Sequence, residues 1–184
     1  LSSKFFLLRA LKSLVSQSHK PFEIILVFDG IYQETSVINE LIKDLEFYPI
    51  ELKILCTNSR AGGSKARNIG INEAGGEIIM FLDDDDAWHP DKILIQLDAF
   101  ISDDDLGLHF TGRKIFLSKK IHESVREVIP KYKIYPNILM NNFIGITSSV
   151  AIRKEVIKSE LFDELLPCRQ DYDLWIRLVN NKVK

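Results

Sequence analysis

Cysteine is scarce in this sequence, long apolar runs are absent, and neither sign of charge dominates. The 184 residues include two cysteines, Cys56 and Cys168, so neither a disulfide framework nor a cysteine-based metal site is expected, and a reducing compartment is the simplest environment. The formal net charge of −2 does not indicate a nucleic-acid partner. No apolar run reaches the roughly 18 residues of a membrane-spanning helix. With 46% hydrophobic and 27% charged residues, the composition is that of a globular domain.

Strand-like and helix-like segments alternate in the first half of the chain. Apolar periodicity predicts strands at 23–28, 51–55 and 78–82, and helices at 5–17, 35–47, 64–74 (with Ser64 as its cap) and 91–101. This alternation is typical of a doubly wound, mainly parallel α/β sheet. After residue 105 we expect a small mixed α+β extension, with strands at 107–117 and 146–153, a polar irregular segment at 119–137, and a last helix near Asp171 that buries Trp175.

Four consecutive aspartates, Asp83 to Asp86, follow the apolar strand predicted at 78–82. They therefore lie at the carboxyl end of a strand, where open α/β sheets bind ligands. Each like-charge pair at about 4 Å costs roughly 1 kcal/mol in water, and a divalent cation removes that cost. Alternate side chains of an extended segment face the same way, so Asp83 and Asp85 can act together. Pro90 fits the first position of the helix that follows. The alternative is a solvated acidic loop in which Asp86 caps that helix.

Five segments, in this order, carry a resemblance to a known family: 6–17, 23–30, 58–68, 77–90 and 171–177. The second ends in Asp29-Gly30, the third contains Ala66-Arg67-Asn68, and the fourth contains an Asp-x-Asp element. Together they resemble the family 2 glycosyltransferases, which have the nucleotide-binding glycosyltransferase A fold. Each segment alone is a weak signal, but five in order at plausible spacings make a strong one.

The resemblance implies a metal-dependent enzyme that transfers a sugar, with inversion, from a nucleotide-diphosphate donor to a hydroxyl acceptor. The implied donor is a UDP-sugar, the implied cofactor is Mn²⁺ or Mg²⁺, and the implied acceptor is a saccharide or lipid-linked saccharide. The setting would be the synthesis of a cell-surface polysaccharide or glycan. We expect a cytoplasmic protein, and peripheral association with the inner face of the membrane is compatible with a lipid-linked acceptor.

The resemblance also assigns roles to individual residues. Asp29 would contact the donor base, Asp83 and Asp84 the donor, and Asp85 the metal, while Asp171 would be the general base that takes the acceptor proton. Arg67, near a predicted helix N-terminus, would add positive potential for the donor phosphates. Simpler alternatives stand beside these roles: a turn residue for Asp29, solvation for Asp84, an exposed helical arginine for Arg67, and a helix N-cap for Asp171.

Three departures from the family pattern affect the expected domain. The family begins with a strand ahead of the first helix, which this sequence lacks; Gln170 stands where the family has Glu; and the sequence ends at Lys184, soon after the acidic helix. We therefore expect residues 1–184 to be a single catalytic domain truncated at both ends, with a nucleotide-sugar half at 1–105 and an acceptor half at 106–184. Two rival functions remain: a sugar-nucleotidyltransferase, and a non-catalytic scaffold that binds sugar nucleotides.

Overall fold

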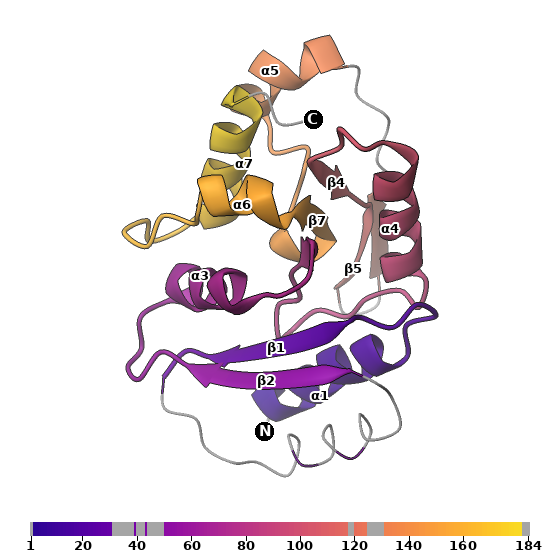
Figure 1. The fold of residues 1–184 in the computed structure, drawn as a ribbon, viewed down its shortest axis with the longest axis vertical. Coiled ribbons are helices and arrows are strands. Elements are labelled where there is room, and N and C mark those ends of the chain that lie inside the picture. The colour runs from indigo at the N-terminus through magenta and orange to yellow at the C-terminus, as the bar shows by residue number, and fades with distance from the viewer. Residues whose placement is uncertain are drawn as a thin grey trace.

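The structure is a computed structural model, and it describes residues 2–30, 39, 43, 50–117, 120–124 and 131–181. Within the helix predicted at 35–47 the structure describes residues 39 and 43 alone, so this prediction is not tested. Figure 1 shows the helices and strands of the described chain, with the parallel strand pair at one end and the last helices at the other. None of the described helices combines the length and the apolar character needed to cross a membrane.

A parallel pair, β1 (Glu23–Phe28) and β2 (Glu51–Cys56), forms the first part of the fold, in the register Glu23 opposite Glu51. Side chains alternate between the two faces of a strand, and helices take up both faces here. Ile24 packs with Leu11 and Leu14 of α1 (Ser2–Val15). Val27 faces α3 (Gly63–Glu73), where Gly70 approaches its side chain. The pair therefore lies between α1 and α3, as Figure 1 shows, and the α/β fold class is confirmed.

A second sheet is antiparallel and consists of β3 (Ile78–Met80), β7 (Val150–Arg153) and β4 (Leu108–Phe110), in the order β3–β7–β4. The strand predicted at 78–82 therefore exists but is shorter, and it pairs antiparallel with β7 rather than with a parallel neighbour. In the described part of the chain, parallel pairing is confined to β1 and β2. An apolar run fixes burial but carries no information about the direction of the partner strand, which explains the difference.

The second half is more regular than the sequence predicts. The strand expected at 107–117 is divided into β4 and β5 (Arg113–Leu117), and β5 pairs antiparallel with β6 (Lys120–Ser124). The helix α5 (Lys131–Met140) bends at Tyr135-Pro136, so the expectation of an irregular segment at 119–137 was wrong for the residues that are described there. Pairing with a neighbouring strand, rather than local apolar periodicity, gives β6 its conformation.

The main core lies where the last helices meet the second sheet. Leu174, Trp175 and Leu178 of α7 (Gln170–Asn180) are fully buried and pack with Ile152 of β7 and Ile157 of α6 (Lys154–Ser159). The Trp175 indole N–H donates a 2.9 Å hydrogen bond to the Gly145 carbonyl, which satisfies its polar atom inside the core. The predicted burial of Trp175 is confirmed.

Candidate functional site

The acidic loop, residues 83–88, follows β3 and is held by two neighbouring segments. One is the buried turn η1 (Thr147–Ser149): the Asp83 backbone N–H donates to Ser148 Oγ at 3.0 Å, and the Trp88 indole donates to the Ser148 carbonyl at 3.0 Å. The other is α1, where Ser13 Oγ accepts from the Trp88 backbone at 3.1 Å and Arg9 donates to the Asp85 carbonyl. The loop is therefore anchored on both sides and is positioned by residues distant in sequence.

Asp83 has a defined orientation because both of its carboxylate oxygens accept hydrogen bonds. Arg67 Nη2 lies 2.7 Å from Oδ1, and Thr147 Oγ1 donates to Oδ2 at 2.9 Å. The side chain keeps 32% of its surface exposed. A carboxylate has about four acceptor positions, so about two remain for a ligand that approaches from the exposed side.

Asp85 is exposed, and among the described residues its side chain has no hydrogen-bond or ion-pair partner. The described residues contain no group of three or more His, Cys, Asp or Glu side chains that could hold a metal ion together. A single hard oxygen ligand from the protein is nevertheless what Mg²⁺-type sites use when substrate phosphates and water supply the rest. The free carboxylate of Asp85 fits that donor set. Asp84 is also exposed.

Asp86 is partly buried at the other end of the acidic run. Burial raises the pKa of its carboxyl, and the neighbouring charges of Asp83 and Asp85 raise it further, while a hydrogen bond with Ser148 acts in the opposite direction. Asp86 does not cap a helix: α4 (Lys92–Ser102) begins at Lys92, with Asp91 at its N-cap position. Pro90 likewise lies ahead of that helix rather than at its first position, so the cap assigned to Asp86 and the helical position predicted for Pro90 are both wrong.

Asp29 follows β1 and binds the loop that follows β2. Its Oδ1 accepts from Ala61 N at 2.7 Å and Thr57 Oγ1 at 3.0 Å, and its Oδ2 accepts from Gly62 N at 3.0 Å. The Ala61 amide makes the largest contribution to a lowered pKa of Asp29, with Gly62, Thr57 and Arg60 adding to it. Three acceptor positions are therefore used inside the protein, and about one remains for a ligand.

Arg67 lies in the second turn of α3, directly above the helix start. Gly62, with φ of 92°, occupies the N-cap position. Ser64 was expected there, but its buried hydroxyl lacks a hydrogen-bond partner in the described structure, so that expectation was wrong. A Cβ added at Gly63 would lie 3.0 Å from Arg67 Nη1, so glycine makes room for the guanidinium. The guanidinium also lies 5.6 Å from the ring centre of Phe162.

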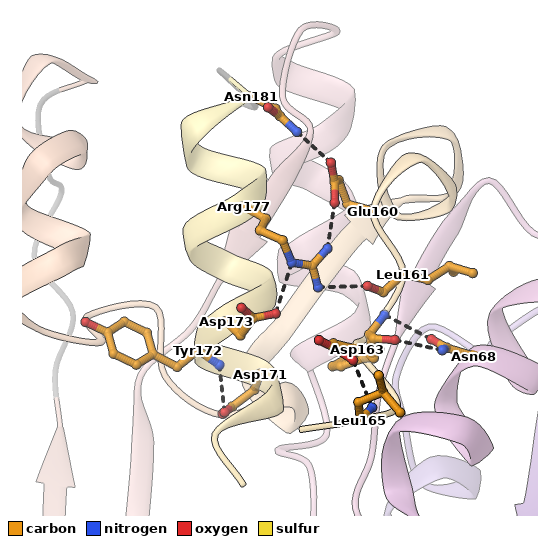
Figure 2. Close-up of polar contacts among 11 residues, drawn as sticks. Asn68, Glu160, Leu161, Asp163, Leu165, Asp171, Tyr172, Asp173, Arg177 and Asn181 are labelled. Atoms are coloured by element: carbon orange, nitrogen blue, oxygen red, sulfur yellow. Dashed lines mark hydrogen bonds and ion pairs between the residues drawn. The ribbon is translucent and has the colours of Figure 1, made fainter. Parts of the chain in front are cut away.

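Asp171 lies in the first turn of α7, where its Oδ1 accepts from the Tyr172 backbone N–H at 2.7 Å (Figure 2). The N-cap position belongs to Arg169, which has a left-handed backbone with φ of 56°, so Asp171 is not the N-cap. Gln170 Nε2 donates to the Leu166 carbonyl at 2.9 Å and thereby joins the helix start to the preceding loop. The Tyr172 hydroxyl donates to the Ile138 carbonyl and fixes the same turn against α5.

The loop at 160–169, which leads to Asp171, is joined to both α3 and α7 (Figure 2). The buried Asn68 side chain accepts from Phe162 N at 3.0 Å and donates to the Phe162 carbonyl at 2.9 Å. Arg177 bonds Glu160 at 2.6 Å and Asp173 at 2.9 Å. The Asn68 bonds join the predicted nucleotide-sugar half to the predicted acceptor half, whereas the Arg177 bonds lie within the acceptor half.

Comparison with known proteins identifies the family. Residues 4–161 match the family model described as glycosyl transferase family 2. The chain belongs to the family 2 glycosyltransferases. The amylovoran biosynthesis glycosyltransferase AmsB of Erwinia amylovora is 28% identical over 186 residues, covering 93% of this chain and 58% of AmsB. An uncharacterized glycosyltransferase of Rickettsia conorii is 29% identical over 173 residues, covering 94% of this chain and 28% of the relative.

Solved structures agree with the glycosyltransferase A fold expected from the resemblance. S. aureus TarS, residues 1–349 in complex with UDP, superposes with a TM-score of 0.71 at 20% identity, covering 96% of this chain and 52% of TarS. The Pyrobaculum calidifontis mannosyltransferase PcManGT, in complex with GDP-Man and Mn²⁺, gives a TM-score of 0.63 at 16% identity, covering 94% of this chain and 48% of that one. At this identity the superpositions describe the fold of this family member and not its ligands.

The predicted site residues of this glycosyltransferase family member fall into three places. Arg67 and Asp83 are in direct contact, with Asp84 and Asp85 next to them in the chain. Asp29 and Asp171 each make their own bonds, and in the described part of the chain neither is bonded to the Arg67–Asp83 pair. Sequence reasoning missed Thr147 and Ser148, because they were assigned to a strand whose burial alone explained them. The run of three hydroxyl residues at 147–149 was the signal available in the sequence.

Proposed function

We propose that this chain is the catalytic part of an inverting glycosyltransferase that uses a nucleotide-diphosphate sugar. The observation that carries the proposal is the arrangement at the end of β3, where Asp83 is oriented by Arg67 and Thr147 and is followed by the free carboxylate of Asp85. Membership of the family supports the reaction type. The unoccupied acceptor positions of Asp83 would bind hydroxyl groups of the donor, and Arg67 would place a positive charge near its diphosphate.

Asp29 would bind the base of the donor. Its one remaining acceptor position suits a ring N–H, which uracil and guanine both carry. We propose a UDP-sugar, as the family resemblance implies, and the TarS complex with UDP supports that choice. The PcManGT complex with GDP-Man makes a guanosine donor the outcome to test against. The name of AmsB, which refers to amylovoran biosynthesis, supports a role in the synthesis of a polysaccharide or glycan.

Asp85 would hold Mn²⁺ or Mg²⁺ together with donor phosphate oxygens and water. A bound divalent cation stabilises the negative charge that develops on the leaving nucleoside diphosphate. The PcManGT complex with Mn²⁺ supports this cofactor. The contribution of this chain is to keep Asp85 exposed while its backbone carbonyl is anchored by Arg9.

Asp171 would act as the general base in a single displacement. The acceptor hydroxyl transfers its proton to the Asp171 carboxylate while its oxygen bonds to the anomeric carbon. The bond between that carbon and the donor phosphate oxygen breaks at the same time, so the nucleoside diphosphate leaves with the electron pair. One base on the face opposite the leaving group is sufficient for such a displacement, and it inverts the configuration.

The test combines nucleotide binding with turnover in the intact protein. We expect calorimetry to detect UDP binding in the presence of Mn²⁺ and to lose it in EDTA. Asp171→Asn should keep the UDP dissociation constant and lose turnover by about 100-fold or more, the usual contribution of a positioned base. The matched control is Asp173→Asn, which removes the same charge from the same helix turn. Equal turnover losses in both variants would contradict the role of Asp171.

Two further outcomes identify the rival functions. Release of pyrophosphate from a nucleoside triphosphate and a sugar phosphate would indicate a sugar-nucleotidyltransferase. Nucleotide binding without transfer to any acceptor or to water would indicate a scaffold that only binds sugar nucleotides.

A further inference from the structure

The turn η1 is made of three hydroxyl residues whose side chains are almost completely buried. Thr147, Ser148 and Ser149 expose 2%, 6% and 4% of their surfaces. A hydroxyl group that is buried without a hydrogen bond costs free energy, so buried hydroxyls normally have a defined partner. Ser148 Oγ accepts the Asp83 backbone N–H, and Ser149 Oγ donates to the Ile146 carbonyl within the turn. Thr147 is different, because its partner is the Asp83 carboxylate of the candidate donor site, whereas the carboxylate that Ser148 bonds is that of Asp86.

Thr147 Oγ1 lies 2.9 Å from Asp83 Oδ2. An ionised carboxylate can only accept, so the threonine hydroxyl is the donor, and a hydrogen bond to a charged acceptor is stronger than a neutral one. The other oxygen of Asp83 is bound by Arg67 at 2.7 Å. Two donors on opposite oxygens fix the plane of the carboxylate, whereas either donor alone would leave it free to rotate about the remaining bond.

Thr147 and Arg67 differ in what they add to the site. The Arg67 guanidinium is charged and keeps 24% of its side chain exposed, so it can also meet the ligand. Thr147 is neutral and buried, so its effect on a ligand has to pass through Asp83. Its branched Cβ restricts the side-chain rotamers, which suits a group whose task is to fix a direction.

We propose that Thr147 is a positioning residue for donor binding, whose hydroxyl fixes the Asp83 carboxylate in the orientation that accepts hydrogen bonds from the sugar nucleotide. This inference rests on the proposed function, since it takes Asp83 as a donor ligand. Thr147 lies outside all the segments that carry the family resemblance.

The first test compares conservative variants in donor titrations. Thr147→Val keeps the shape and removes the hydroxyl, and we expect it to raise the donor KM about ten-fold with kcat within about two-fold, the pattern of a lost uniform binding interaction. Thr147→Ser keeps the hydroxyl and should stay within about two-fold of the parent in both constants. Thr111→Val is the matched control, because the contact of its hydroxyl among the described residues is a 3.4 Å bond to the Ser149 carbonyl.

The second test is a double-mutant cycle with Asp83→Ala, read as the dissociation constant of UDP with Mn²⁺. If Thr147 acts through Asp83, Thr147→Val causes no further loss of affinity in the Asp83→Ala background. The inference is overturned if Thr147→Val causes an equal loss of UDP affinity in both backgrounds. It is also overturned if Thr147→Ser binds UDP as weakly as Thr147→Val does. If Thr147→Val does not fold, as judged by circular dichroism, Thr147→Cys replaces it, since a thiol is a weak donor of similar size.

The two proposals fail in different ways. Absence of nucleotide binding and of transfer in the unsubstituted protein would overturn the proposed function and this inference together. Normal binding and transfer in the parent, with unchanged constants in Thr147→Val, would overturn the inference alone.

Discussion

Arg67 and Asp83 form an ion pair with 2.7 Å between Nη2 and Oδ1, so two residues proposed to bind the same donor also bind each other. The pair joins the second turn of α3 to the end of β3, and the guanidinium also lies over the Phe162 ring. Because both side chains remain partly exposed, the ion pair is itself a modest contribution to stability. Its position after β3 places it in the site proposed to bind the donor.

Replacing Arg67 should separate its two possible contributions. If the guanidinium contacts the donor phosphates, Arg67→Ala weakens UDP binding about ten-fold or more, since charge-assisted bonds to phosphate are strong. The affinity for uridine, which has no phosphate, is then unchanged. If the guanidinium acts only by holding Asp83, the affinities for UDP and for uridine fall equally. Calorimetric titration of UDP and uridine against both proteins distinguishes these outcomes. Arg67→Lys is the informative companion, because it keeps the charge but loses the planar pair of donors.

Replacing Asp85 tests the metal assignment. We expect Asp85→Ala to remove the Mn²⁺-dependent part of UDP binding and to leave the fold intact, because the change takes away an exposed charge that its neighbours repel. Asp104→Ala removes the same charge from an exposed loop far along the chain and is the control. UDP affinity in Asp85→Ala that still falls in EDTA as it does in the parent would refute the assignment.

The sequence predicts the elements whose burial is local and misses the contacts that depend on pairing. Strands β1 and β2 and helices α3, α4 and α7 follow from apolar periodicity, because each buries one face or both against neighbours that the pattern implies. The kinked α5 interrupts its own pattern with Pro136, so the periodicity does not reveal it. The last helix is found because Leu174, Trp175 and Leu178 repeat at helical spacing.

The candidate site shows the same division. Asp83 and Asp85 are predictable, since four adjacent carboxylates after a buried strand need an explanation. The bond from Thr147 to Asp83 is not, because 64 residues separate the two and only the antiparallel pairing of β3 with β7 brings them together. The roles of Asp83 and Asp85 remain predictions, as do those of Asp29 and Asp171, whose bonds inside the protein explain their positions equally well.

Asn68 should matter for both stability and turnover. Asn68→Ala leaves the buried N–H and carbonyl of Phe162 without their partner, which should lower the free energy of unfolding by about 2–4 kcal/mol. Because Phe162 belongs to the loop that leads to Asp171, we also expect kcat to fall more than UDP affinity. Urea denaturation and donor turnover measure the two effects.

The control for Asn68→Ala is Lys65→Ala. Lys65 lies on the same helix as Asn68, and its replacement removes an exposed ion pair with Glu164. An exposed pair of this kind contributes about 0–1 kcal/mol, so the control should unfold nearly as the parent does. A loss of stability in Asn68→Ala no larger than in Lys65→Ala would show that the Phe162 loop holds its position without this side chain.

Lys92 makes the stability of the protein depend on pH in an unusual direction. Its side chain is 6% exposed, with Nζ donating to Gln96 and lying 5.0 Å from the centre of the Trp88 ring. Burial lowers the pKa of Lys92 to about 7, from an ordinary value of 10.5. Burial, and then the positive charge of Lys92, lower the pKa of the nearby His109 from its ordinary value of 6.5. His109 therefore does not titrate between pH 7 and pH 10.5.

Between pH 7 and pH 10.5 the unfolded chain keeps the Lys92 proton that the folded protein has lost. The cost of burying the charged lysine is fully present below pH 7 and is relieved as the pH rises toward 10.5, so stability increases across that window. The expected slope is at most about 1.4 kcal/mol per pH unit. Urea denaturation at pH 6, 7.5 and 9 should show this rise in the parent and in the exposed control Lys158→Met, but not in Lys92→Met. Parallel pH profiles for the parent and Lys92→Met would mean that Lys92 stays charged in the folded protein, with its ammonium stabilised by Gln96 and the Trp88 ring.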